Sequence, residues 1–215
     1  MIKSAKFETS CTNVEGTRAL EPLPQLAFVG RSNVGKSSLL NMLVGQKGLA
    51  VTSSTPGRTR LINFFRVRLG QKILAGDKDT NVEVFFVDLP GYGFAAGSKK
   101  MQHGWGESIP KFLIGSDKLQ RVFVLLDIRR VPSDLDVSML LFLQKNSIPF
   151  TILATKADKF SRAQVSNHVR VLAGHLGVGL SDIIATSAKG QGRAEVLQII
   201  ASSIFSDLAN PPVSS

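Results

Sequence analysis

The sequence predicts an α/β fold with a doubly wound, mostly parallel sheet of six strands, one antiparallel pair at an edge, and helices on both faces. Short apolar runs that are typical of buried strands alternate along the chain with segments whose apolar residues recur at helical spacing. The exception is a pair of apolar runs, 61–69 and 82–89. The stretch GQKILAGDKDTN between them suits a hairpin connection, which predicts the antiparallel pair.

Residues 25–45 predict the first strand, turn and helix. The run QLAFV (25–29) leads into a glycine-rich turn, and KSSLLNMLVG then carries leucines at helical spacing. Gly45 suits the end of this helix, because glycine adopts the left-handed conformation at little cost.

Five further strands and four further helices are predicted in the rest of the chain. The strands are expected at 61–69, 82–89, 121–128, 149–156 and 182–188. The helical patterns are SIPKFLIG, SDLDVSMLLFLQKN, SRAQVSNHVRVLAGHLG and GRAEVLQIIASSIF. We expect one domain over residues 1–215, with its core at about 22–205 and loosely held ends at 1–20 and 206–215.

The composition favours a protein with one hydrophobic core in a reducing compartment. A chain of 215 residues that is 43% hydrophobic can bury one such core. No apolar run approaches the ~20 residues that cross a bilayer, and residues 1–20 lack the apolar centre of a signal peptide. The single cysteine, Cys11, forms no internal disulfide, so we expect a soluble, cytoplasmic protein with no membrane partner.

The chain is strongly basic, and the excess is concentrated in one segment. It carries 26 lysines and arginines against 16 acidic residues, and no acid lies between Glu21 and Asp77. Such a charge distribution attracts polyanions, nucleic acid above all, although a solvated surface that serves solubility is an equally good interpretation. On the first interpretation, Arg60, Arg66 and Arg68 are expected on an outer face that binds RNA.

The stretch FVGRSNVGKSSLL (28–40) contains two glycines that bracket four residues and are followed at once by lysine and serine. In this pattern between a strand and a helix, backbone N–H groups surround a phosphate, the lysine reaches the outer phosphates and the serine binds Mg²⁺. The strand and helix contexts both fit, so a chance glycine-rich turn is the less favoured alternative. The predicted phosphate contacts are Gly30, Arg31, Ser32, Asn33, Val34, Gly35, Lys36, Ser37 and Ser38.

The stretch VDLPG (87–91) is expected at the end of its strand. There Asp88 can hold Mg²⁺ through a water molecule, and the Gly91 N–H can reach a γ-phosphate. Asp88 taken alone is as well explained by a helix cap or a strand-end charge, but its place downstream of a phosphate loop favours the metal role. Leu89 and Pro90 complete the predicted contacts of this stretch.

Two later strand ends carry groups that recognise guanine. In TKAD, the Asp158 carboxylate can accept N1–H and N2–H of guanine together, a donor pair that adenine lacks. In TSAKG, a backbone N–H near Ala188 can reach guanine O6. Because ligands bind at the carboxyl ends of strands in open α/β sheets, these motifs predict one guanine-nucleotide site. The predicted contacts here are Thr155, Lys156, Ala157, Asp158, Thr186, Ser187 and Ala188.

This series of motifs resembles the Ras-like, translation-factor-related P-loop GTPases. TSSTPGRTRLINFF (52–65), VDLPGYGFA (87–95), Trp105 and LLDIRRVPSDLD (125–136) resemble more closely the EngB/YsxC (YihA) family of ribosome-assembly GTPases, over about residues 5–205. The resemblance implies GTP and GDP with Mg²⁺, a switch in large-subunit assembly, and a link to cell division and septation.

The resemblance also implies roles for residues that spacing alone does not assign. Thr59 would join Ser37 on Mg²⁺ when GTP is bound, so that Ser37, Thr59 and Asp88, the last through water, form the metal site. Lys36, Thr59 and Gly91 would be the catalytic residues. The nucleotide-contacting part of the first switch would be Gly57, Arg58, Thr59, Arg60 and Leu61.

The chain departs from the family pattern at Arg60, where glutamine is usual, and in the connection 70–81, which is longer than expected. Tyr92 follows Gly91 at the place where many small GTPases carry a water-orienting glutamine. We expect its ring to point away from the site and intrinsic turnover to be slow. Asn33 either holds K⁺ beside the phosphates, as in GTPases with this loop residue, or only shapes the loop.

Several functions compete at this point. The leading one is a monomeric GTPase that binds the large-subunit precursor and its rRNA. The alternatives are a tRNA- or other RNA-associated GTPase and an RNA-binding module with a weak nucleotide site. An ATP-dependent phosphotransferase on the same fold lacks support, since no acceptor-binding region or lid is evident in the sequence.

Overall fold

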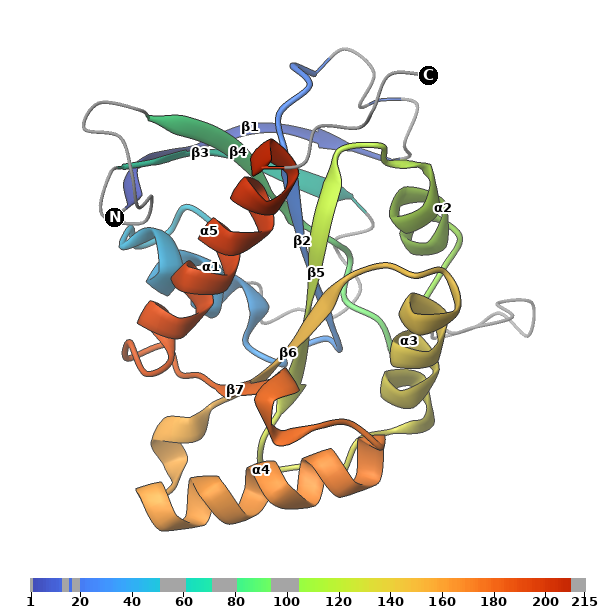
Figure 1. Cartoon of the computed structure of the whole chain (residues 1–215), viewed down its shortest axis with the longest axis vertical. Helices are drawn as coiled ribbons and strands as arrows, with labels where there is room; N and C mark the ends of the chain where they lie inside the picture. The colour runs from blue at the N-terminus through green and yellow to red at the C-terminus, as the bar shows by residue number, and fades with distance from the viewer. Residues whose placement is uncertain are drawn as a thin grey trace.

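A seven-stranded sheet runs through the protein in the order β1-β3-β4-β2-β5-β6-β7, with helices on both faces (Figure 1). The structure, a computed structural model, describes residues 2–12, 16, 20–50, 61–70, 81–93 and 105–209, with backbone alone for 205–209. The strands are β1 (Ile2–Cys11), β2 (Gln25–Gly30), β3 (Ile62–Leu69), β4 (Val82–Asp88), β5 (Leu119–Asp127), β6 (Phe150–Thr155) and β7 (Ile183–Ala185). The helices are α1 (Lys36–Val44), α2 (Ser108–Gly115), α3 (Asp134–Lys145), α4 (Arg162–Leu176) and α5 (Arg193–Ala209).

The fold class predicted from the sequence is confirmed. β2 pairs in parallel with both β4 and β5, and the parallel arrangement continues through β6 to β7. β3 and β4 pair antiparallel, as the hairpin pattern between them predicted. The carboxyl ends of the parallel strands therefore meet at one edge of the sheet.

The expectation that residues 1–20 are loosely held is wrong for Ile2–Cys11. These residues form β1, which pairs antiparallel with β3 and places Lys6 opposite Arg66 and Cys11 opposite Ile62. The sheet thus has seven strands and two antiparallel pairings instead of six and one. The segment IKSAKFETSC has no apolar run, because β1 lies at the edge and most of its side chains are only partly covered.

The other end of the chain also differs from the expectation. Helix α5 continues to Ala209, beyond the expected end of the core at about residue 205. Residues 210–215 lie outside the described residues.

Arg66 joins three carboxylates that come from separate parts of the chain. Its guanidinium donates to Glu8 at 3.0 Å, to Glu21 at 2.7 Å and to Glu83 at 2.9 Å. These bonds, the one to Glu8 above all, raise the pKa of Arg66 above its already high value. The expected RNA-binding role of Arg66 is therefore not supported, because its donors hold β1 and β4 against β3. Arg68 is 51% exposed and contacts Glu83 at 3.4 Å.

Each face of the sheet packs against its own helices. Along β2, Ala27 and Val29 point to one face and Leu26 and Phe28 to the other, and all four are fully buried. The first face packs against α2, α3 and α4, and the second packs against α1 and α5 (Figure 1). Burial on both faces is the reason that strands such as β2 are continuous apolar runs in the sequence.

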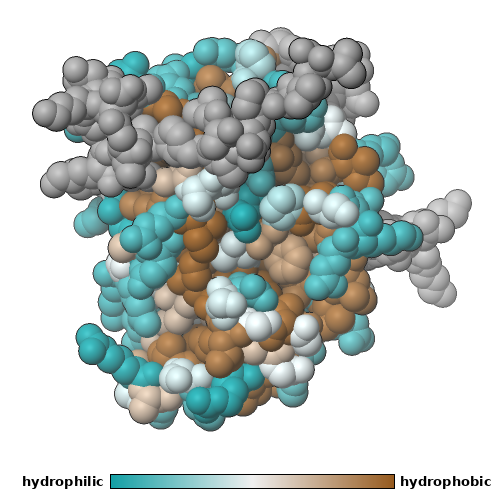
Figure 2. Space-filling view, in the orientation of Figure 1, coloured by the Kyte–Doolittle hydropathy of each residue, from teal (hydrophilic) through white to brown (hydrophobic). Residues whose placement is uncertain are grey.

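The surface mixes polar and apolar side chains. In the space-filling view, apolar residues gather in the middle of the face shown and polar residues surround them (Figure 2). In the part of the chain that the structure describes, none of the helices combines the length and apolar character needed to span a bilayer.

Arg66→Met should lower the free energy of unfolding by about 2 kcal/mol, because three carboxylates lose the partner that they share. Arg68→Met is the matched control on the same strand and should cost at most about 0.5 kcal/mol, as for other exposed ion pairs. Urea unfolding of the wild type and both variants measures the difference. If the two variants lower the free energy of unfolding equally, a structural role for Arg66 is contradicted.

Candidate nucleotide-binding site

The predicted phosphate loop lies between the end of β2 at Gly30 and the start of α1 at Lys36. A Cβ atom at Gly30 would lie 2.8 Å from the Leu125 carbonyl oxygen, so only glycine fits where the loop leaves the sheet. Asn33 and Gly35 have φ angles of 64° and 105°, in the left-handed region that asparagine and glycine tolerate best. The sequence of the loop therefore permits a sharp turn into α1.

The N-terminus of α1 suits an anion. Gly35 caps the helix without a side-chain hydrogen bond, and no acidic residue lies in the first turn. The first backbone N–H groups thus lack a side-chain cap, and the helix dipole favours negative charge there. Within the loop, Val34 is buried and Asn33 is exposed. Partly buried hydroxyl and guanidinium groups nearby come from Arg31, Ser32, Ser37 and Ser38.

Lys36 and Asp88 form an ion pair at the carboxyl edge of the sheet. The Lys36 ammonium donates to Asp88 Oδ1, and both side chains are largely buried. The pairing of β2 with β4 sets Asp88 opposite Phe28 and so brings the carboxylate to the loop. A carboxylate and the Ser37 hydroxyl are the oxygen donors that Mg²⁺ prefers, and the lysine supplies a cation for phosphate. The residues present therefore fit a nucleotide with its Mg²⁺.

Part of the predicted site lies outside the described residues. This part comprises Gly57, Arg58, Thr59 and Arg60, and most of the connection 70–81 is outside them as well. Leu61 is described, and it is exposed immediately before β3. The roles of Thr59 in binding Mg²⁺ and in catalysis remain predictions.

The stretch after β4 approaches the phosphate loop. Leu89 and Pro90 are buried, and Gly91 is exposed. A Cβ atom at Gly91 would lie 3.0 Å from Ser32 Oγ and 3.2 Å from the Ser32 backbone nitrogen. Gly91 therefore lies directly against the loop, beside the predicted phosphate contacts.

The Tyr92 ring points into the core, which confirms the expectation that it turns away from the site. Its side chain is 2% exposed, and its hydroxyl donates to Asp136 Oδ1 at 2.8 Å. Burial, followed by the charge of Asp136, raises the pKa of the hydroxyl well above its usual value. The hydroxyl thus stays protonated and bonded to α3.

The turn that carries TKAD is bonded to the phosphate loop. The Thr155 hydroxyl at the end of β6 donates to the Val34 carbonyl oxygen at 2.7 Å. The Lys156 ammonium donates to the Asn33 carbonyl oxygen at 2.9 Å. The predicted base-recognition and phosphate-binding parts are therefore held together by the chain itself.

The two predicted guanine-recognition turns also contact each other. The Ala157 N–H donates to the Thr186 carbonyl oxygen at 3.0 Å, and Thr186 and Ser187 are buried while Ala188 is exposed. Asp158 is mostly buried and pairs with the Lys189 ammonium at 3.2 Å. The recognition of guanine by Asp158 stays a prediction, and it requires the base to replace this lysine at the carboxylate.

Asp127 is a charged residue of this edge to which the sequence patterns assigned no role. It ends β5, is 9% exposed, and accepts hydrogen bonds from Arg129 Nη2 at 2.8 Å and Lys156 Nζ at 2.9 Å. Burial opposes ionisation, but the bonds from Arg129 and Lys156 outweigh it and hold the pKa of the Asp127 carboxyl well below its usual range. An aspartate directly after the apolar run RVFVLL was the available signal, as it was for Asp88.

Comparison with known proteins identifies the family. Residues 25–156 match the model of a family described as 50S ribosome-binding GTPase. A probable GTP-binding protein EngB from Desulfatibacillum aliphaticivorans is 45% identical over 201 residues, which cover 93% of this chain and 91% of that protein. The chain belongs to the EngB family of GTP-binding proteins.

Two further relatives agree with the EngB assignment. A probable GTP-binding protein EngB from Fusobacterium nucleatum is 42% identical over 200 residues, which cover 93% of this chain and 96% of that protein. The crystal structure of a probable GTP-binding protein EngB aligns with a TM-score of 0.59 at 28% identity, over 85% of this chain and 99% of that chain. The family resemblance that the motifs indicated is confirmed, and EngB membership implies GTP and GDP with Mg²⁺.

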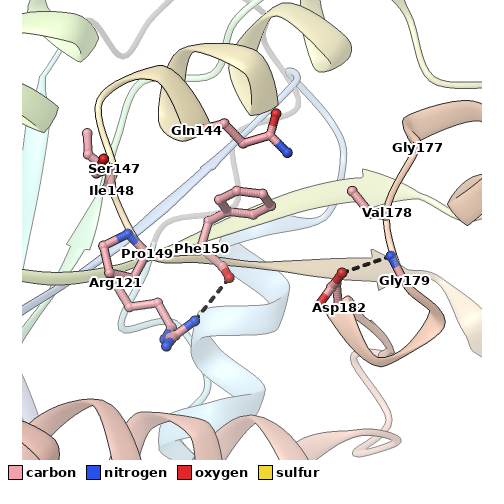
Figure 3. Close-up of a pocket in the computed structure, with 10 residues that line it drawn as sticks. All are labelled: Arg121, Gln144, Ser147, Ile148, Pro149, Phe150, Gly177, Val178, Gly179 and Asp182. Carbon is pink, nitrogen blue, oxygen red and sulfur yellow. Dashed lines mark hydrogen bonds between the residues drawn. The ribbon is translucent and has the colours of Figure 1, made fainter.

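A hollow of about 440 Å³ lies at the opposite, amino ends of β5 and β6 (Figure 3). The Arg121 guanidinium in it donates to the Phe150 carbonyl oxygen at 3.0 Å, and Asp182 accepts from the Gly179 N–H at 2.8 Å. Its charged groups are thus bonded within the chain. None of the nucleotide contacts predicted from the motifs lines it, so it is separate from the site described above.

Asp127→Asn should weaken GDP binding about tenfold, because Lys156 loses the charged partner that positions it. Stability at neutral pH should fall by about 2 kcal/mol. The folded-state pKa is depressed, so this contribution is present above the unfolded pKa of about 4 and is lost as the pH falls below it. Urea unfolding should therefore show a constant difference between the free energies of unfolding of wild type and variant at pH 6 to 8. This difference should become smaller below about pH 4.

The matched control for this carboxylate is Asp117→Asn, at a strongly exposed side chain that pairs with Lys118 at 3.3 Å. It should change neither GDP affinity nor stability by a measurable amount. A stability gap for Asp127→Asn that is independent of pH would contradict a role for the ionised carboxylate.

Proposed function

We propose that this chain hydrolyses GTP slowly and acts as a switch in the assembly of the large ribosomal subunit. The observation that carries the proposal is the meeting of the phosphate loop with Asp88 and with the TKAD turn at one edge of the sheet. The description of the matching family as ribosome-binding supports the choice of partner. A guanine nucleotide with and without its third phosphate supplies the two states of the switch.

Each group of the chain has a separate task in this chemistry. Lys36 neutralises the outer phosphates, where charge develops during phosphoryl transfer. Ser37, Thr59 and, through water, Asp88 would hold Mg²⁺, and the bound ion would supply further positive charge to the phosphates. The Tyr92 hydroxyl donates to Asp136 and so does not orient an attacking water, and for this reason we expect turnover to be slow.

Exposed cations beside the base-recognition turns support a polyanionic partner. Arg130, Lys159 and Lys189 are each more than half exposed. Arg130 follows Asp127, Lys159 follows Asp158, and Lys189 lies on the TSAKG turn. The net charge of +10 adds a long-range attraction to RNA. We therefore propose the large-subunit precursor and its rRNA as partners of a cytoplasmic monomer, with effects on cell division and septation. A tRNA or another RNA is the alternative partner.

K⁺ should raise the rate of GTP hydrolysis above the rate in Na⁺ at equal ionic strength. The Asn33 amide is exposed and makes no side-chain hydrogen bond within the described part of the chain, so it is free to help hold a cation beside the phosphates. Phosphate release in KCl and NaCl measures the effect. Asn33→Gly, which keeps the left-handed backbone without strain, should abolish it. Equal rates in the two salts would leave Asn33 with a loop-shaping role only.

Binding to large-subunit precursor particles should be tighter with a non-hydrolysable GTP analogue than with GDP, as measured by co-sedimentation. Affinity should fall steeply with salt, by a slope of about 0.7–0.9 per phosphate contact. Replacing Arg130 and Lys159 with glutamine should lower this slope by about one to two units, whereas Lys111→Gln, an exposed lysine on α2, should not. Equal binding in the two nucleotide states would contradict the switch.

A further inference from the structure

Tyr92 continues the pairing between β4 and β2 beyond the ends of both strands. Its N–H donates to the Gly30 carbonyl oxygen at 3.2 Å, and its carbonyl oxygen accepts from the Ser32 N–H at 3.0 Å. These bonds lie on the C-terminal side of Gly91. The position of Gly91 against the phosphate loop therefore depends on where Tyr92 is held.

The side chain of Tyr92 is anchored on the opposite side, in the core below α3. Its ring packs near Trp105, with 6.5 Å between the ring centroids, and Trp105 contacts Phe142 of α3. The hydroxyl donates to Asp136 Oδ1 at 2.8 Å in a fully buried bond. One residue thus links the phosphate loop, through its backbone, to α3, through its side chain.

Asp136 uses both of its carboxylate oxygens. Oδ2 accepts from the Ser133 N–H at 2.8 Å and from the Ser133 hydroxyl at 2.7 Å, in the capping box that begins α3. Asp136 is 3% exposed, and within the described residues it forms no ion pair with a lysine or arginine. Because a buried carboxylate is costly unless its hydrogen bonds are made, the Tyr92 hydroxyl is an important partner.

We propose that Tyr92, held by Asp136, is a positioning residue that fixes the Gly91 N–H and thereby sets the preference of the site for a nucleoside triphosphate over a diphosphate. The inference rests on the proposed function in taking Gly91 as a donor to the third phosphate. A diphosphate relies on the phosphate loop and the base-recognition turns, neither of which contacts the Tyr92 hydroxyl. A third phosphate needs a donor whose position is set in advance, because ordering a mobile one costs affinity.

Tyr92→Phe tests this inference, since it keeps the buried ring and removes only the hydroxyl. Affinity for a non-hydrolysable GTP analogue should fall about tenfold, while affinity for GDP stays within about twofold. Asp136→Asn should produce the same selective loss. The double variant should lose no more than the more affected single variant, because the two groups act as one unit.

The matched control is Ser203→Ala on α5. The Ser203 hydroxyl accepts from Arg121 Nε at 2.7 Å, beside the hollow at the opposite end of the sheet. This variant should lower the melting temperature without changing the ratio of triphosphate to diphosphate affinity. If Tyr92→Phe lowers both affinities equally, or neither, the inference is overturned. A wild-type chain that binds GDP but not the GTP analogue would instead overturn the proposed switch.

Discussion

Parallel pairing of the central strand β2 with both β4 and β5 is the constraint on which the site depends. Parallel neighbours end at the same edge of a sheet, so backbone hydrogen bonds deliver the phosphate loop, Asp88 and Asp127 to one place. The pairing is stabilised by apolar side chains that are buried on both faces of β2. Core packing and site geometry are thus set by the same strand, and a change that shifts its register would disturb both.

The elements that were predicted correctly are those whose burial leaves a local pattern. β2 is an apolar run in the sequence, and α1 has leucines at helical spacing, so the fold class could be predicted from the sequence. β1 left no such pattern, because an edge strand is held by its neighbour and by contacts between residues far apart in the chain. Arg66 is the clearest case: its three carboxylate partners cannot be recognised from the acid-free segment around it.

The residues of the site also fall into those that a local sequence pattern predicts and those that it does not. The motif residues have fixed spacing, and the described ones, Lys36, Asp88 and Asp158 among them, lie at or just after strand ends or at the start of α1, at one edge of the sheet. Asp127, like Asp88, directly follows an apolar run, so it could have been predicted from the sequence. The role of Asp136 could not have been predicted, since the stretch SDLD indicates only the start of a helix. Its bond to Tyr92 spans 44 residues and depends on how α3 packs.

β1 is the outermost strand on its side of the sheet, and along the described chain no strand pairs with its free edge. An open strand edge is a template on which a second molecule can add a strand and start aggregation. The pairing of β1 with β3 shifts register twice, between Ile2 and Ser4 and between Phe7 and Thr9, and Lys3 and Lys6 are exposed. Irregular backbone and lysine side chains hinder a continuous ladder between molecules, so the strand at this edge of the sheet carries features that oppose the addition of a strand from a second molecule.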